Sequence, residues 1–203
     1  MKNYEKELPS GYTEALHINA LDKKLGLVLN LAALVILAVV VLLGLIPIFI
    51  GEPIEYDSIM GFIASTVFIV AMLLYMVLHE LVHGVAHKIL TKEKLSFGIS
   101  WSCAWCGVPN IYVYRRASLI ALVAPLITFT VILLPLTVLL YFVSPYYYIV
   151  SLAILATHLG GCIGDIYMTF LLLTRFSDNA ILVRDTGPEQ YIYIPANENN
   201  KEG

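Results

Sequence analysis

The stretch MVLHELVHGVAHKIL, residues 76–90, decides how the rest of the chain is interpreted. It contains the pattern HExxH, formed by His79, Glu80 and His83, inside a long apolar run. Residues four apart on an α-helix lie on one face about one turn apart, so two imidazoles can hold one metal ion while the glutamate reaches a metal-bound water. Ionisable groups are unfavourable in a membrane-spanning segment, and those that occur there usually have a function. The apolar setting therefore makes this otherwise common pattern stronger evidence for a metal site.

The composition favours a membrane protein. Of 203 residues, 59% are hydrophobic and only 13% are charged, which is far from the composition of a soluble domain. Four apolar runs each exceed the roughly 20 helical residues needed to cross a bilayer core, at residues 25–50, 59–90, 118–143 and 147–174. The sequence therefore predicts an all-α membrane fold, with four transmembrane helices and a cytoplasmic-side β-hairpin-like loop between helices two and three.

The basic residues predict the orientation. All 12 lysines and arginines lie in the two tails or in and beside the central loop, and the two short loops contain none. Positive charge is enriched on the cytoplasmic side of membranes, so we expect a multi-pass protein with both termini in the cytoplasm. The expected domains are an N-terminal tail at 1–24, a transmembrane domain at 25–174 and a C-terminal tail at 175–203. The net charge of −3 says little about partners, because the predicted cytoplasmic side is locally basic, but the sequence has no basic stripe that would indicate a nucleic-acid partner.

The central loop has the period of a β-strand. Leu95, Phe97, Ile99 and Trp101 alternate with small residues, and residues 111–114 could return as a second strand. An exposed edge of such a hairpin could bind an extended peptide by strand addition, which makes Phe97, Ile99 and Trp101 candidate substrate-binding residues. The alternative is an aromatic hairpin at the membrane interface that binds no ligand.

Two weaker patterns have structural interpretations. Short apolar runs at residues 181–183 and 191–194 flank an Asp-Thr-Gly-Pro sequence, which predicts a small hairpin in the C-terminal tail. Cys103 and Cys106 form a single CxxC pair, and we interpret them as ordinary reduced cysteines rather than a zinc or redox site.

A second buried carboxylate lies in the fourth apolar run. Glu80 and Asp165 are the only acidic residues in the four runs. At ~1.5 Å per helical residue, Asp165 lies roughly 15 Å and His79 roughly 14 Å from the charged ends of their helices. Three glycines at positions 160–164 would let another helix approach closely. The sequence therefore predicts a carboxylate at the level of the histidines.

Two histidines, one carboxylate and a water are the ligands of a catalytic zinc ion. We predict one Zn²⁺ held by His79, His83 and Asp165, with Glu80 as general base and then as the acid that protonates the leaving amine. His87 lies too far round the helix from His79 to share the ion, and His158 lies too deep. Two alternatives stay open. The polar groups could relay protons in a transporter, or the protein could be a catalytically silent membrane scaffold.

The sequence resembles a known family. HELVHG in an apolar helix, the hairpin-like loop, Ala124-Pro125 and the late GGCIGD resemble the membrane zincin peptidases related to site-2 proteases. That resemblance implies an intramembrane zinc metallopeptidase that hydrolyses peptide bonds of a membrane or membrane-associated protein near the cytoplasmic face. It assigns zinc to His79, His83 and Asp165 and acid–base catalysis to Glu80. The site-2 signature has Asn and Pro before the aspartate, whereas this chain has glycines.

Overall fold

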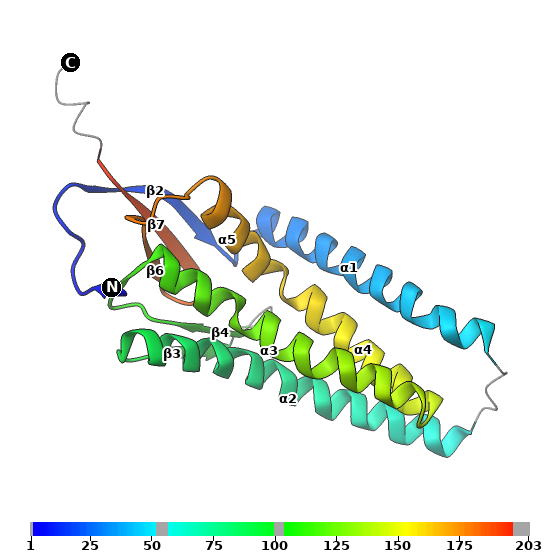
Figure 1. The fold of residues 1–203 in the computed structure, drawn as a ribbon. Coiled ribbons are helices and arrows are strands. Elements are labelled where there is room, and N and C mark those ends of the chain that lie inside the picture. Colours follow the sequence, from blue (N-terminus) through cyan, green and yellow to red (C-terminus); the bar gives the residue numbers. More distant parts are fainter. Residues whose placement is uncertain (1, 52–56, 100–103, 197–203) are drawn as a thin grey trace. The chain divides into compact units, whose positions relative to one another are not determined.

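The computed structural model describes residues 2–51, 57–99 and 104–196 and contains both helices and strands (Figure 1). The helices are α1 Lys23–Ile50, α2 Ser58–Thr91, α3 Arg115–Tyr141, α4 Pro145–Gly161 and α5 Ile163–Thr174. The strands are β1 Tyr4–Glu5, β2 Tyr12–Asn19, β3 Ser96–Ile99, β4 Ala104–Gly107, β5 Tyr112–Tyr114, β6 Leu182–Asp185 and β7 Glu189–Pro195.

The prediction of an all-α fold is wrong, because the described chain also forms a five-stranded antiparallel sheet in the order β1-β5-β6-β7-β2 and a two-stranded sheet, β3-β4. The larger sheet draws its strands from the N-terminal tail, the end of the central loop and the C-terminal tail. Strand pairing between such distant segments depends on tertiary packing, which local sequence patterns do not reveal. The two segments predicted as tails are therefore structural parts of one sheet.

The central hairpin exists, but its second strand differs from the prediction. β3 pairs with β4, so that Phe97 lies opposite Cys106. Residues 112–114, expected as the partner of β3, instead form β5 of the larger sheet. Trp101 and Cys103 lie outside the described residues. The expected C-terminal hairpin is present as β6 and β7.

Four helical segments are long and apolar enough to cross a membrane, and they coincide with the four predicted runs. Helix α1 has no buried side chain among its described residues, and apolar side chains such as Leu42 and Phe49 are exposed along it. Exposed apolar surface of this extent is unfavourable in water, so it fits a lipid environment. The fourth run is not continuous, since α4 ends at Gly161 and α5 begins at Ile163 (Figure 1).

Helix α2 carries the HExxH pattern and has clear boundaries. At its start, Asp57 accepts hydrogen bonds at its carboxylate from the backbone N–H groups of Ile59 and Met60, as an N-cap does. Beyond its end, Lys92 adopts a positive φ of 59° and donates its N–H to the carbonyl of Lys88, which is a typical helix C-terminal geometry. The helix is uninterrupted between these points, so its geometry fixes the spacing of the residues along it.

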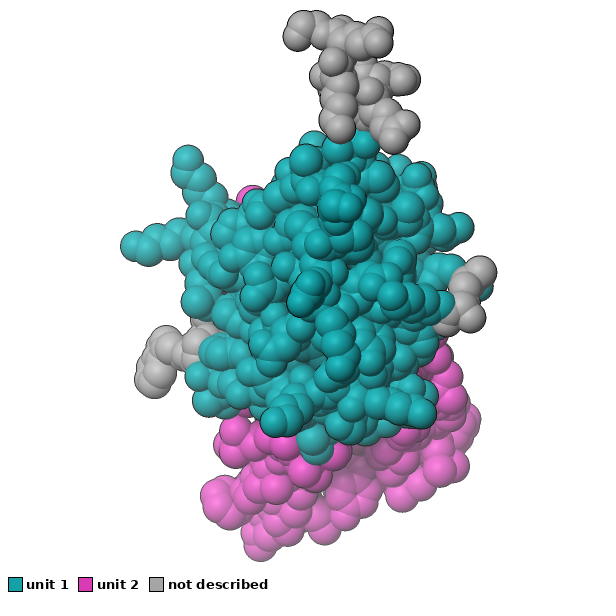
Figure 2. All heavy atoms as spheres, turned by 90° about the vertical axis from the view of Figure 1, so that its left-hand side faces the viewer, with its two compact units in different colours: residues 1–26, 80–124, 165–203 teal, residues 27–79, 125–164 magenta. Residues whose placement is uncertain are grey.

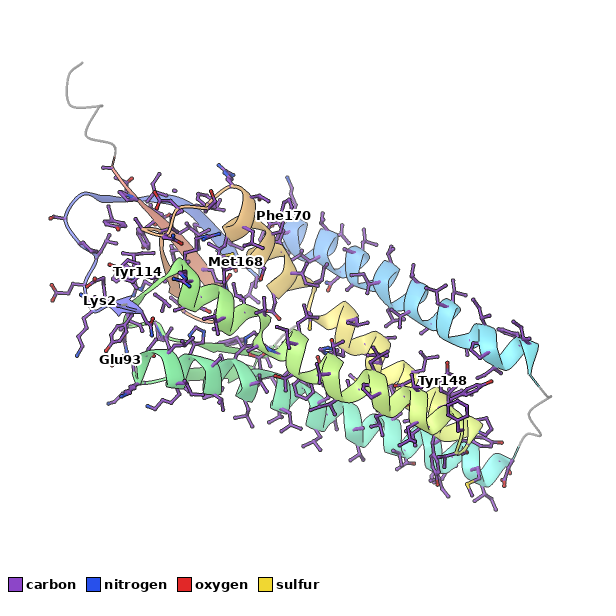
Figure 3. The ribbon with its side chains drawn as sticks, viewed as in Figure 1. Lys2, Glu93, Tyr114, Tyr148, Met168 and Phe170 are labelled. Carbon is purple, nitrogen blue, oxygen red and sulfur yellow. The ribbon has the colours of Figure 1, made fainter. Side chains whose placement is uncertain are left out.

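The chain divides into two compact units (Figure 2). Unit 1 comprises residues 1–26, 80–124 and 165–203, and unit 2 comprises residues 27–79 and 125–164. The core of unit 1 packs α5 and the first half of α3 against the larger sheet. Its buried members are Leu122, Met168 (labelled in Figure 3), Leu172, Phe176, Ile181, Val183 and Ile192.

Unit 2 contains most of the apolar helices. A Cβ atom on Gly160 of α4 would lie 2.9 Å from the carbonyl oxygen of Ala33 on α1, so only glycine permits this approach. Tyr148, labelled in Figure 3, donates its hydroxyl to the carbonyl of Gly44. Polar contacts between helices therefore supplement apolar packing in this unit.

Candidate metal centre

The buried face of α2 is a stripe of histidines. His79, His83 and His87 are 8%, 8% and 5% exposed, while Leu81 and Val85 between them are exposed. The spacing of four residues places the three imidazoles along one side of the helix. The helix therefore presents its metal-binding groups inward and its apolar groups outward.

His83 has a fixed orientation within unit 1. Its Nδ1 lies 2.9 Å from the carbonyl oxygen of Ala121, and its Nε2 lies 3.4 Å from Oδ1 of Asp165. A carbonyl oxygen only accepts hydrogen bonds, so Nδ1 must carry the proton and donate it. Nε2, the nitrogen that faces the carboxylate, is consequently the atom that can bind a metal. Orientation of a ligating histidine by a backbone carbonyl is the usual arrangement in metal sites.

Asp165 owes its position to the helix break. Cys162 ends α4 with φ −74° and ψ 2°, and the new helix places Asp165 in the first turn of α5. The N-terminus of a helix carries partial positive charge, which stabilises a carboxylate. The sequence predicted one continuous span here, and the glycines around Cys162 are the signal that could have revealed the break.

His79 is oriented by a residue that sequence reasoning missed. Its Nδ1 lies 2.9 Å from the hydroxyl of Tyr75, one turn earlier on α2. Its ring also stacks on Phe129, with the ring planes 8° apart. Because Nδ1 is engaged with Tyr75, a metal bond from His79 would use Nε2. The i, i+4 spacing of Tyr75 and His79 was the available signal in the sequence.

Glu80, the predicted general base, directly follows His79 and is half-buried. It precedes His83 by three residues, a spacing that makes side chains neighbours on a helix surface. The same short stretch of α2 therefore supplies two predicted ligands and the predicted base.

A second group of metal-binding side chains lies within unit 2. His79, His158 and Cys162 offer donor atoms within 4.8 Å of one another, and all three are buried. However, Nδ1 of His158 lies 2.8 Å from the Tyr75 hydroxyl and 3.7 Å from the Cys162 sulfur, while its Nε2 lies 3.1 Å from Oγ1 of Thr130. Both nitrogens of His158 thus take part in hydrogen bonds within the bundle.

The β3-β4 hairpin packs against α2 at Gly84, the residue after His83. A Cβ atom on Gly84 of α2 would lie 2.7 Å from Cζ of Phe97 and 3.3 Å from the sulfur of Cys106. The glycine that follows the HExxH pattern therefore lets the hairpin approach the helix. Of the three predicted substrate-binding residues, Phe97 is 50% and Ile99 is 71% exposed on β3, and Trp101 is outside the described residues.

His87 lines a separate small cavity in unit 1. The cavity measures about 10 Å³, room for about one water molecule, and its polar lining includes Ser118, Asp185 and Gln190. Among the residues that the structure describes, Nδ1 of His87 has no hydrogen-bond partner. His87 is therefore a buried histidine that faces this cavity.

Asp185 belongs to the predicted turn. Its carboxylate accepts a hydrogen bond from the N–H of Gly187, 2.8 Å away, and Gly187 has a φ of +103° that favours glycine. Burial raises the pKa of Asp185 to about 7. The Asp-Thr-Gly sequence is therefore a turn, and its aspartate is held in a poorly solvated place.

Comparison with known families gives one match. Residues 72–180, more than half of the chain, match the family described as "Putative zincin peptidase". The chain belongs to this family. Membership in a zincin peptidase family indicates a metallopeptidase and a zinc cofactor, so the predicted resemblance to zincin peptidases is confirmed, whereas a relationship to site-2 proteases stays a prediction. Neither the curated proteins nor the solved structures yield a match to the chain.

Proposed function

We propose that the protein is an intramembrane zinc metallopeptidase whose single ion is held by His79, His83 and Asp165. The observation that carries this proposal is the approach of Asp165 Oδ1 to within 3.4 Å of Nε2 of His83, whose Nδ1 already donates to a carbonyl. A carboxylate and an imidazole nitrogen that face each other need a cation between them, either a proton or a metal ion.

The donor set fits zinc. Two imidazole nitrogens and one carboxylate oxygen leave a fourth tetrahedral position for water or substrate, as catalytic zinc sites do. Helix α2 itself places the two histidines one turn apart, and the Asp165 carboxylate faces His83. A purely structural zinc site would usually have four protein ligands, with cysteine among them.

The side chains then have distinct roles. Bound zinc would lower the pKa of a water molecule and polarise the scissile carbonyl. The Glu80 carboxylate takes a proton from the attacking water as the new C–O bond forms. Glu80 then gives this proton to the amine nitrogen as the C–N bond breaks, so the carboxylate is regenerated. Hydrogen bonds from His83 to Ala121 and from His79 to Tyr75 keep both imidazoles oriented.

A membrane location is supported by the four long apolar helices and their exposed apolar side chains. The distribution of basic residues supports cytoplasmic termini. With this orientation, the substrate is a peptide segment of a membrane or membrane-associated protein, cut near the cytoplasmic face.

Strand β3 is the proposed substrate platform. Within the described part of the chain, β4 is the only strand paired with β3, so the other edge of β3 offers backbone groups to an extended peptide. Phe97 and Ile99 project exposed apolar side chains from this strand, and Phe97 also contacts the helix at Gly84, next to His83. Strand addition would thus bring a peptide close to the ion.

The decisive experiment compares wild type with Glu80→Gln. Full-length protein is purified in detergent, its zinc is measured by mass spectrometry, and cleavage is followed with a mixture of fluorescent transmembrane peptides. We expect one zinc per chain in both proteins and less than about a tenth of wild-type cleavage in the variant, because Glu80 transfers protons and does not bind the ion. A wild-type protein without zinc would instead favour the proton-relay alternative.

A further inference from the structure

A continuous row of hydrogen bonds lies behind His79 in unit 2. Oγ1 of Thr130 lies 3.1 Å from Nε2 of His158, Nδ1 of His158 lies 2.8 Å from the Tyr75 hydroxyl, and this hydroxyl lies 2.9 Å from Nδ1 of His79. His158 is completely buried. Packing alone does not require these polar groups, because an apolar side chain would fill the same space and would need no hydrogen-bond partner.

The direction of these bonds follows from a metal bond at His79. A neutral imidazole that binds a metal through Nε2 carries its proton on Nδ1. His79 must then donate to the Tyr75 oxygen, and Tyr75 must donate its single hydroxyl proton to Nδ1 of His158. This leaves the His158 proton on Nε2, where it is donated to Thr130. The opposite order would put the His79 proton on Nε2 and prevent metal binding there.

We propose that Tyr75 and His158 are positioning residues that hold His79 in its metal-binding tautomer. This inference rests on the proposed zinc site and adds the residues that tune it. Phe129 supports the arrangement, because its ring lies 5.2 Å from Tyr75, 5.8 Å from His158 and 6.4 Å from His79, between ring centroids. An apolar ring at this position limits the access of water molecules, which would otherwise compete for these hydrogen bonds.

The same hydrogen bonds disfavour a second metal site at His158 and Cys162. An ion at His79, His158 and Cys162 that used Nδ1 of His158 would displace the Tyr75 hydroxyl from this nitrogen. Use of Nε2 would displace Thr130 instead. The hydrogen-bonded row therefore engages both nitrogens of His158, and the Cys162 thiol lies 3.7 Å from Nδ1 of His158 as a weak donor.

The first test measures zinc affinity by competition with a chelator in full-length, detergent-purified protein. Tyr75→Phe removes only the hydroxyl, and we expect zinc binding about 10–100-fold weaker, the usual effect of losing a partner of a ligating histidine. Tyr148→Phe is the matched control, because it removes a hydroxyl that bonds to Gly44 in the same unit. Its zinc affinity is expected to equal that of wild type.

Rescue distinguishes positioning from packing. His158→Asn keeps a hydrogen-bond acceptor near the position of Nδ1 and is expected to bind zinc within about threefold of wild type, whereas His158→Leu, which keeps bulk but no acceptor, should match Tyr75→Phe. If Asn and Leu weaken zinc binding equally, His158 does not act through Tyr75.

The protonation of His158 can be measured directly by NMR spectroscopy of the wild-type protein. In zinc-loaded wild type labelled with ¹⁵N-histidine, His158 is expected to carry its proton on Nε2. A His158 with its proton on Nδ1, or a folded Tyr75→Phe protein with wild-type zinc affinity, would overturn the inference while leaving the zinc site intact. A wild-type protein that binds no zinc would refute the proposed function, and this inference with it.

Discussion

Nε2 of His83 on α2 and Oδ1 of Asp165 on α5 lie 3.4 Å apart, although the two residues belong to different apolar runs of the sequence. The helix break at Cys162 gives Asp165 its place at the start of a helix. One histidine of the HExxH pattern and the distant carboxylate therefore lie next to each other.

Removal of this carboxylate should remove the ion. We expect Asp165→Ala to contain less than about a tenth of the wild-type zinc when both proteins are saturated and then washed, because two ligands remain out of three. His87→Ala is the matched control, since it deletes another buried histidine of the same stripe. The measurement is the zinc content of both folded variants. Loss of zinc from His87→Ala but not from Asp165→Ala would assign the third ligand to His87.

The stability of the protein should depend on pH through Asp185. Burial raises its folded-state pKa to about 7, so between about pH 4 and pH 7 the folded form retains a proton that the unfolded form has lost. Stability therefore falls as the pH rises through this window, by up to about 4 kcal/mol, and is constant above it.

Asp185→Asn provides the comparison, because the amide keeps an acceptor for Gly187 but cannot ionise. The variant should have a higher melting temperature than wild type at pH 8 and a similar one at pH 4. Parallel pH profiles for the two proteins in detergent would show that Asp185 does not cause the dependence.

The free edge of β3 can be tested with proline. Successive backbone N–H groups of a strand point to opposite edges, so proline at Ser96 and proline at Phe97 remove donors from different edges. The variant that loses the outward donor should cleave peptides at least about fivefold more slowly with normal zinc content. Phe97→Ala controls for the lost ring. Wild-type cleavage by both proline variants would exclude strand addition at β3.

The predicted orientation can be measured by cysteine labelling from outside intact cells. In a cysteine-free background, a cysteine at Ser144 is expected to react, and cysteines at Lys94 and Arg184 are not, because basic segments remain in the cytoplasm. Labelling at position 94 from outside would reverse the topology and place the hairpin on the other face.

The sequence predicted what local patterns encode. Three of the four apolar runs appear as single helices of nearly the expected bounds, and the fourth appears as α4 followed by α5. His79, His83 and His87 form a buried stripe, as their spacing suggests. The five-stranded sheet was missed because it pairs segments that are distant in the sequence, and because β1 has only two residues, too few to show a period of two. Such short strands are stabilised by pairing with strands that are distant in the sequence and become adjacent only in the folded protein.

Residues that orient the proposed ligands were also missed, because the spacing of Tyr75 and His79 alone does not reveal such a role. Tyr75 looks like an ordinary aromatic residue of an apolar helix until its hydroxyl is found between two histidines. The carbonyl of Ala121 orients His83, but every residue type has a backbone carbonyl, so the sequence cannot identify this contact. Sequence patterns therefore reveal ligands more readily than the groups that hold ligands in place.

The short helix α5 has a further consequence. Asp165 is at one end of it, and Met168 and Leu172 on the same 12-residue helix pack into the core with Val183 and Ile192 of the sheet. The proposed third ligand is therefore anchored to the C-terminal strands. We therefore expect a deletion or tag that disturbs β7 to weaken the proposed zinc site from a distance, so that a truncation of the C-terminal strands would abolish the proposed activity with every proposed catalytic residue still present.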